Sequence, residues 1–285
     1  MSRDDTPKVF KKGYGSNFVI PFAIVLIGSL IIFGVTKMLR TDRGYKDLVR
    51  ELHSKTFGNR WIAAFELSKV ISANGVPEDE VPWLVENLED LYLSAGDNRT
   101  KNFIIVTLGA LNTKDALDTI EKGLIDSDPQ TKFHSIVALS KMDIDENYDW
   151  SKVFGLLKSS DEGLKQASIL TLATHRVPRA KPRLLELLSS GSRNIRYASA
   201  TGLIYYQEDS ALPTIQKILE LQVKPGNSPS SLNEDKVYGL KLNIINSLRK
   251  TRWKKLARIV TEHIKNEKNL KLVSAARQVL DELKD

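Results

Sequence analysis

Residues 128–139, DPQTKFHSIVAL, hold the pattern from which the fold can be worked out. The residues at +3, +4 and +7 after its lysine, Lys132, are Ser135, Ile136 and Leu139. In an α-helix these positions lie on one face, and the small Ser135 lets a neighbouring helix approach closely. Asp128 is a good N-cap because its carboxylate accepts hydrogen bonds from the first free N–H groups of a helix. The stretch therefore predicts a helix that begins after Asp128 and buries one face.

The same pattern recurs along the chain after residue 44. Each copy has a basic residue, a small or aliphatic pair at +3 and +4, and an apolar residue near +7. The copies begin at Arg60, Lys101, Lys132, Lys165, Arg196, Lys241 and Lys271. In the last copy, Ser274 and Ala275 form the pair, and Val279 takes the apolar role one residue late. Self-similarity at steps of 30 to 45 residues is typical of a helical-repeat protein.

A cap residue and a second amphipathic stretch precede most of these helices. The expected caps are Asp97, Asp128, Asp161 and Ser192. The amphipathic stretches are residues 82–93, 116–125, 150–157, 182–188, 212–221 and 253–264. Neither helix of such a pair can bury its apolar stripe alone, so the pairs must stack on one another. The sequence thus predicts an all-α fold, an α-solenoid of about seven helical hairpins.

These hairpins resemble HEAT repeats, in the short form that also occurs in bilin lyases. The resemblance covers residues 45–285 and rests on DPQTKFHSIVAL, on RWIAAFEL at residues 60–67 and on NIRYASATGL at residues 194–203. It implies a right-handed solenoid. It also implies a protein that binds or scaffolds other proteins. It does not identify the partner, because function is set by sites and not by the fold.

The resemblance further implies a ladder between repeat units, in which the basic residue pairs with the aspartate that precedes it. Carried over, Lys132 with Asp128 and Lys165 with Asp161 would be structural pairs and not catalytic ones. At the acidic position, Arg60 has a threonine and Lys241 has a valine, so the ladder is not expected at those two units.

The N-terminal part of the chain differs from the repeats. Residues 18–35, FVIPFAIVLIGSLIIFGV, are uncharged, and with their polar edges they are long enough to cross a bilayer. They are longer than the apolar stretch of a cleaved signal peptide and more evenly apolar than a buried soluble helix. We therefore expect a basic tail at 1–17, a transmembrane helix at 18–39, a linker at 40–44 and the solenoid at 45–285.

This organisation predicts a single-pass protein of the cell membrane. More Lys and Arg residues follow the apolar segment than precede it, which favours a cytoplasmic solenoid. The opposite orientation stays open, because a cytoplasmic solenoid requires Lys11 and Lys12, which precede the apolar segment, to be moved across the membrane.

Composition excludes several kinds of chemistry. The chain has no cysteine, which excludes disulfides and Cys-ligated metals. The four histidines are far apart and lack the spacing of a metal site: His53, His134, His175 and His263. No phosphate-binding loop or nucleophile elbow is present. We therefore expect no catalytic residue, no metal and no cofactor, and a protein that is not an enzyme.

Charge is unevenly spread along the chain, whose formal net charge is +7. Residues 76–128 carry a net charge of −8, and residues 176–271 carry +11. The densest basic segment is the candidate partner-binding site: Arg249, Lys250, Arg252, Lys254, Lys255 and Arg258. The loop at 223–235, rich in Pro, Gly, Asn and Ser, is either an adaptable contact or a tolerated insertion.

Together these features predict a membrane-tethered scaffold or adaptor that binds a membrane-associated protein partner. Two alternatives come from HEAT-like relatives: a bilin-lyase-like enzyme and a nucleic-acid-binding module. Nucleic acid is the less favoured partner, because residues 1–43 hold +4 of the +7 net charge and residues 44–285 hold only +3.

Overall fold

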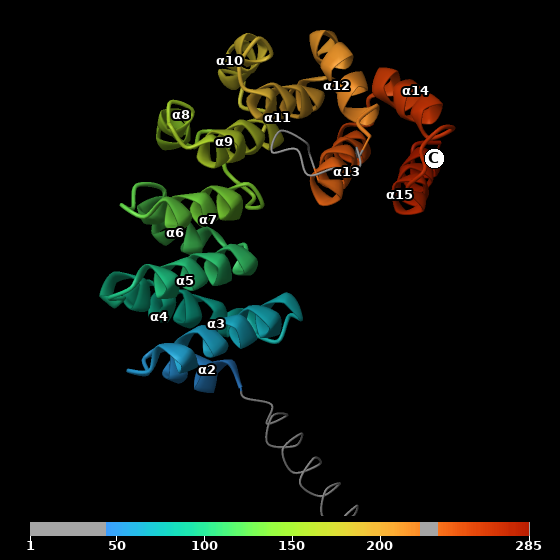
Figure 1. The fold of residues 1–285 in the computed structure, drawn as a ribbon. Coiled ribbons are helices and arrows are strands. Elements are labelled where there is room, and N and C mark those ends of the chain that lie inside the picture. The colour runs from blue at the N-terminus through green and yellow to red at the C-terminus, as the bar shows by residue number, and fades with distance from the viewer. Residues whose placement is uncertain (1–43, 223–232, 285) are drawn as a thin grey trace, which may run out of the picture. The chain divides into compact units, whose positions relative to one another are not determined.

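The computed structural model describes residues 44–222 and 233–284, and all regular secondary structure there is helical (Figure 1). The α-helices form seven consecutive pairs: α2 (Tyr45–Leu52) and α3 (Phe57–Ser72), α4 (Val81–Ser94) and α5 (Asn98–Leu111), α6 (Leu117–Leu124) and α7 (Pro129–Leu139), α8 (Ser151–Leu156) and α9 (Glu162–Thr174), α10 (Ala180–Leu187) and α11 (Arg193–Leu203), α12 (Leu212–Leu219) and α13 (Glu234–Thr251), α14 (Lys254–His263) and α15 (Leu270–Glu282). Short 3-10 turns join some of them: η1 (Glu78–Glu80), η2 (Lys114–Ala116), η3 (Ile204–Tyr206) and η4 (Asp209–Ala211).

Capping side chains start four of the second helices where the sequence predicts them. The Asp97 carboxylate accepts a hydrogen bond from the backbone N–H of Thr100 at 2.8 Å. The Asp128 carboxylate accepts one from Thr131 at 2.9 Å. The other two caps accept hydrogen bonds from their own helices in the same way: Asp161 and Ser192. All four predicted caps are confirmed.

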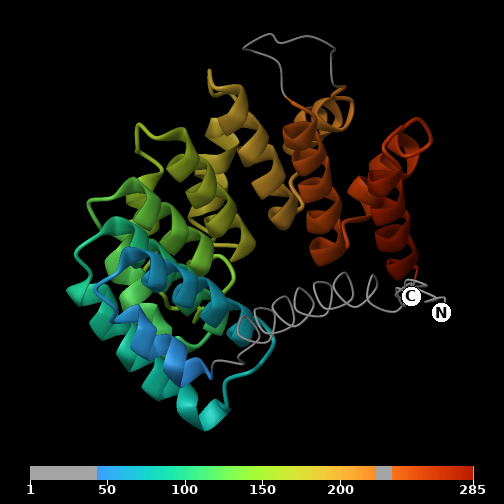
Figure 2. The ribbon, with the colours of Figure 1, turned by 60° about the horizontal axis from the view of Figure 1, so that its bottom comes forward.

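The second helices stack side by side in chain order. Contacts divide the chain into a unit of residues Met1–Asp47 and a unit of residues Leu48–Asp285, and the account here concerns the second unit. In it α3 packs on α5, α5 on α7, α7 on α9, and α9 on α11, while the first helices α4, α6, α8, α10, α12 and α14 each pack against their own second helix (Figure 2). The regular stacking loosens at α13, which reaches the preceding hairpin mainly through η3.

The face predicted to be buried is buried in the first six copies of the pattern. Every residue at +3, +4 and +7 after the basic residue is buried there, from Ala63 in α3 to Leu248 in α13. Small residues at +3 are fully enclosed where helices meet most closely: Ala63, Ser135, Ser168 and Ser199. The core therefore runs as one continuous layer between the two helices of successive hairpins.

The seventh copy is shifted by one residue from its predicted register. In α15, Leu272, Ala276 and Val279 are buried, whereas Ser274 is exposed. Asn269 caps this helix by accepting hydrogen bonds from the backbone N–H groups of Lys271 and Leu272. The buried face is therefore counted from Leu272 and not from the lysine before it, which explains why Val279 is one residue late in the sequence pattern.

Ion pairs join successive hairpins, but not in the way that the family ladder implies. Arg60 pairs with Asp97 at 2.8 Å, and Lys101 pairs with Asp126 at 3.0 Å. Both basic residues reach forward to the next hairpin. Among the described residues, Lys132 forms no ion pair with Asp128, and Lys165 forms none with Asp161.

Capping does not by itself prevent an ion pair, because Asp97 caps α5 and also pairs with Arg60. The carboxylates of Asp128 and Asp161 bind N–H groups of their own helices. Arg60 and Lys241, the two positions where no ladder is expected, do form pairs, because their acidic partners come from the following unit.

The predicted membrane localisation needs correction. Within residues 44–222 and 233–284, no helix is both long and apolar enough to cross a membrane. The predicted transmembrane helix at 18–39 and the tail at 1–17 lie outside the described residues. So does most of the predicted 223–235 loop, whose last residues, 233–235, begin α13.

Candidate functional site

The second helices expose a regular set of side chains that lies beside the buried face. These are the residues at +1, +5 and +9 after the basic residue in the first six copies of the pattern, which share one side of a helix. We call them the exposed rows: Trp61, Phe65 and Lys69 in α3; Asn102, Val106 and Ala110 in α5; Phe133, Val137 and Lys141 from α7; Gln166, Leu170 and Thr174 in α9; Tyr197, Thr201 and Tyr205 in α11 and η3; Leu242, Asn246 and Lys250 in α13. Apart from Thr201, all are half-buried or exposed.

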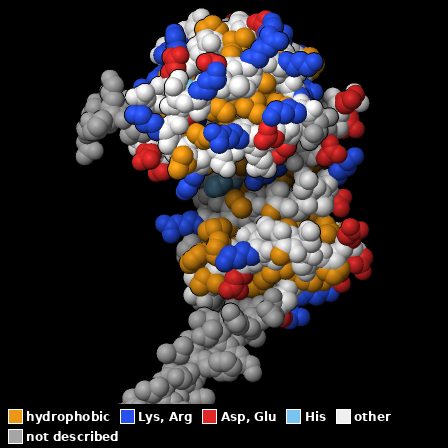
Figure 3. Space-filling view, turned by 90° about the vertical axis from the view of Figure 1, so that its right-hand side faces the viewer, with side chains coloured by type: hydrophobic (Ala, Val, Ile, Leu, Met, Phe, Trp, Pro, Cys, Tyr) orange, Lys and Arg blue, Asp and Glu red, His pale blue; other side chains and the backbone are white. Residues whose placement is uncertain are grey.

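Six of the nine residues in the first three rows are apolar, and the polar ones are Lys69, Asn102 and Lys141. Trp61, Phe65, Val106 and Phe133 are 40%, 47%, 42% and 37% exposed. The Trp61 ring stacks on Phe103 of the next hairpin, with ring centroids 6.3 Å apart. Figure 3, viewed from the right of Figure 1, shows hydrophobic side chains gathered over the N-terminal helices. Single exposed apolar residues are ordinary, but a set carried by three stacked helices is a candidate interaction surface.

The last three rows line a polar pocket of about 480 Å³, the row pocket. Its walls are Leu170 and Thr174 of α9, Thr201 and Tyr205, and Asn243, Asn246, Ser247, Arg249 and Lys250 of α13. No carboxylate lies among these lining residues. The Arg249 guanidinium is paired with Glu282 at 2.8 Å. Burial lowers the pKa of the neighbouring His175, against the hydrogen bond to the Leu139 carbonyl and the negative charge of Asp143, and the positive charge of Lys250 adds a smaller lowering.

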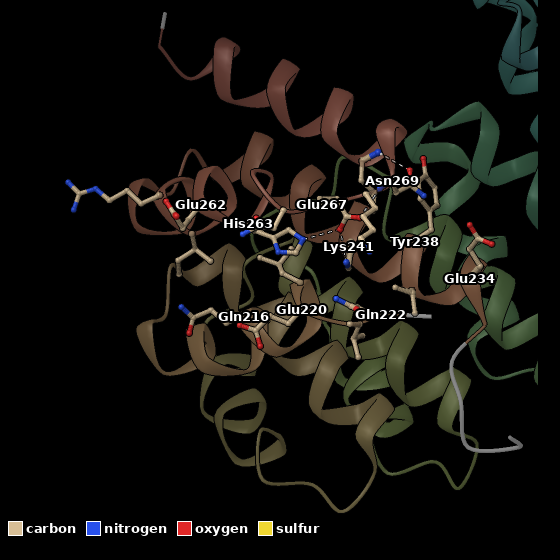
Figure 4. Close-up of a pocket in the computed structure, with 18 residues that line it drawn as sticks. Gln216, Glu220, Gln222, Glu234, Tyr238, Lys241, Glu262, His263, Glu267 and Asn269 are labelled. Carbon is tan, nitrogen blue, oxygen red and sulfur yellow. Dashed lines mark hydrogen bonds and ion pairs between the residues drawn. The ribbon is translucent and has the colours of Figure 1, made fainter. Parts of the chain in front are cut away.

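A second, larger hollow of about 820 Å³ lies between α12, α13, α14 and α15 (Figure 4). Three side chains converge in it: Lys241, His263 and Glu267. The Lys241 ammonium donates to the Glu267 carboxylate at 2.6 Å, and His263 lies 3.0 Å from the same oxygen. The side chains of Lys241 and Glu267 are only 7% and 9% exposed. The Lys241–Glu267 ion pair joins one hairpin to the next, as the Arg60–Asp97 pair does, so the hollow surrounds a structural contact.

Burial and the Lys241–Glu267 ion pair strongly affect the pKa of the Glu267 carboxyl. Burial alone would raise the pKa of the Glu267 carboxyl. Hydrogen bonds from Lys241, from the Asn269 backbone and from His263 outweigh that effect and lower the pKa from 4.5 to about 2. Glu267 is therefore a fixed negative charge at neutral pH and is not suited to proton transfer.

The structure scatters the basic residues predicted as the partner-binding site. All six are exposed: Arg249, Lys250, Arg252, Lys254, Lys255 and Arg258. Lys250 and Arg249 line the row pocket, Lys255 pairs with Asp209 of η4, and Arg258 lines the hollow beside α12. Arg252 ends α13 in a left-handed conformation. The structure thus places two of the six at the row pocket and one at the hollow beside α12, and their role in binding a partner stays a prediction.

Sequence reasoning missed the apolar rows. Tryptophans are expected to be packing residues, and Trp150 and Trp253 are indeed buried, but Trp61 is exposed. The signal was present in the sequence, because +1 and +5 follow from the same repeat alignment that gives the buried positions. The aromatic residues at those positions, Trp61, Phe65 and Phe133, would have pointed to the surface.

Neither a protein-family model nor a curated protein sequence matches the chain. Solved structures do match. One is the complex of CpcE and CpcF of phycocyanin lyase from Nostoc sp., with 14% identity, 84% of this chain and 94% of that chain covered, and a TM-score of 0.56. Another is YibA of Escherichia coli, with 12% identity, 86% and 83% covered, and a TM-score of 0.50. At these identities the likeness shows the fold: a HEAT/armadillo-like helical repeat.

Proposed function

We propose that this protein is a scaffold that binds a protein partner along the exposed rows, and that it acts by binding and not by catalysis. The observation that carries the proposal is the set of exposed apolar side chains on three successive second helices: Trp61, Phe65, Val106 and Phe133. Exposing Trp61, Phe65 and Phe133 to water costs free energy that a partner would recover on covering them. Large aromatic side chains of this kind supply much of the binding energy at protein interfaces.

The arrangement also favours a protein over a nucleic acid. A nucleic-acid surface needs many cations to neutralise phosphates. The exposed rows contain three lysines, and aromatic or aliphatic side chains occupy most of the N-terminal half. Stacked second helices offer one long binding surface, which suits an extended partner.

The test is affinity capture from a lysate with the full chain and two matched variants. The row variant carries Trp61→Ala, Phe65→Ala and Phe133→Ala. The control carries Leu93→Ala and Ile125→Ala, which remove side chains 62% and 67% exposed on the first-helix side. We expect the row variant to lose captured proteins, measured by quantitative mass spectrometry, while the control retains them. Equal capture by the wild type and the row variant would contradict the proposal.

A further inference from the structure

The lining of the row pocket indicates which chemical groups the partner carries. This inference rests on the proposed function. Its lining carries the ammonium of Lys250, and Thr174, Tyr205, Asn243 and Asn246 supply hydroxyl and amide groups. None of the lining residues is acidic. Because Arg249 is engaged by Glu282, Lys250 is the lining cation that offers its charge to the pocket. A carboxylate is the complementary group for such a set of donors.

The charged residues of the exposed rows favour carboxylates outside the row pocket as well. The +9 position is lysine in α3, after α7 and in α13, and no row residue is acidic. The Lys69 ammonium lies 4.2 Å from the centroid of the Phe65 ring, so a cation borders the apolar rows as well. A helix C-terminus favours cations by itself. The lysines that face along the rows, however, also set the sign of charge that a partner meets.

Helix packing gives the distance between the two kinds of contact. The helices α7, α9 and α11 pack in succession. Two steps of roughly 8–10 Å separate α7, the helix of Phe133, from α11, whose Thr201 lines the row pocket, about 16–20 Å in total. An extended chain spans that distance with about six residues.

We propose that the exposed rows bind an extended polypeptide segment with bulky apolar side chains and, about six residues away, carboxylates. The apolar side chains cover Trp61, Phe65 and Phe133. The carboxylates enter the row pocket beside Lys250. The partner is thus recognised by a pair of features at a fixed separation.

Fluorescence anisotropy with labelled peptides and the full chain tests this directly. The reference peptide has two phenylalanines, a Gly/Ser spacer of about six residues and two aspartates. One comparison peptide replaces the aspartates by asparagines, and another shortens the spacer to about two residues. We expect the reference peptide to bind about tenfold more tightly than either, since both lose the charge contact.

Two charge reversals of the protein supply the matched comparison. Lys250→Glu alters the row pocket, and Lys254→Glu makes the same change on α14, outside it. We expect Lys250→Glu to weaken the reference peptide about tenfold and Lys254→Glu to leave it unchanged. A peptide with two lysines in place of the aspartates should regain binding to Lys250→Glu. That rescue is not expected if Lys250 serves only to hold the fold. If the basic segment acted as a whole, both reversals would weaken binding.

The outcomes separate this inference from the proposed function. Equal binding of the aspartate and asparagine peptides overturns the inference about carboxylates. So does an absence of peptide binding combined with loss of partner capture by the row variant, although the proposed function then stands. If no peptide binds and the row variant still captures its partners, both fail. Circular dichroism of each variant, with helical signal and melting midpoint matching the wild type, shows that the fold is retained.

Discussion

At the scale of single residues, several helices end on a side chain in a conformation that glycine prefers. The residues with positive φ are Asn74, Asn112, Arg176, Gln207 and Arg252. Arg176 has a φ of 50° directly after α9, and its N–H donates to the Ala173 carbonyl at 2.8 Å. A Cβ in this region clashes with the backbone at a cost of roughly 1–2 kcal/mol.

Replacing Arg176 with Gly should therefore raise the free energy of unfolding by roughly 1 kcal/mol. The matched control is Arg179→Gly, which makes the same change of charge at a φ of −65°. There glycine removes the Arg179 contact with the Phe154 ring and adds backbone freedom, so stability should fall by roughly 0.5–1 kcal/mol. Urea unfolding measures both. Equal effects of the two substitutions would contradict the assignment of strain to Arg176.

The buried joint of Lys241 and Glu267 makes a prediction about pH. The folded-state pKa of Glu267 lies below its unfolded value of 4.5, at about 2. Its contribution to stability is thus fully present above about pH 4.5 and is lost as pH falls toward 2. We expect Glu267→Gln to destabilise the protein at pH 7 by roughly 3 kcal/mol, since Lys241 loses its buried partner.

The difference between wild type and Glu267→Gln should shrink as pH falls from 5 to about 2, because protonation removes the same charge. Melting temperatures of both proteins over that range test the effect, and other carboxylates cancel in the comparison. A difference that stays constant with pH would mean that Glu267 stabilises the joint by shape and not by charge.

At the scale of helices, close approach between hairpins depends on residues without a side chain. A Cβ added at Gly109 of α5 would lie 2.6 Å from the Ala138 Cβ and 3.1 Å from its Cα in α7. Neither atom can move without shifting the helix. By contrast, a Cβ added at Gly155 of α8 would meet no atom within 4 Å.

Gly109→Ala should therefore destabilise the protein by roughly 1–3 kcal/mol, the usual cost of overpacking. Gly155→Ala should instead stabilise it, by up to about 1 kcal/mol, because alanine favours a helix over glycine. Thermal unfolding followed by circular dichroism distinguishes them. If both substitutions stabilise, α5 and α7 do not pack as closely as described.

The helices also show which local features a sequence reveals. Caps such as Asp97 and Asp128 were predictable because they act within about four residues. The partners of Arg60 and Lys241 were not, since their acidic residues lie in the next hairpin, 37 and 26 residues away. The register of α15 was missed because the lysine at 271 resembles the basic residue of the pattern, whereas burial begins at Leu272.

At the scale of the whole molecule, the periodic pattern was enough to predict stacked hairpins, because each copy buries the same positions. The candidate site was predictable only in part. Arg249 and Lys250 line the row pocket, whereas Lys254, Lys255 and Arg258 follow the turn at Arg252 and belong to α14. Residues from three hairpins line the row pocket, and a pattern within one helix does not predict which residues so far apart in the sequence come together.

The central claim is that a protein partner covers the exposed rows, and hydroxyl-radical footprinting of the full chain with and without its captured partner tests it most directly. Aromatic and large aliphatic side chains report their exposure by their rate of oxidation. The account predicts that the partner protects Trp61, Phe65 and Phe133 while Leu93 and Ile125, exposed on the first-helix side, react as before. Protection of Leu93 and Ile125, with the three row residues unchanged, would contradict it.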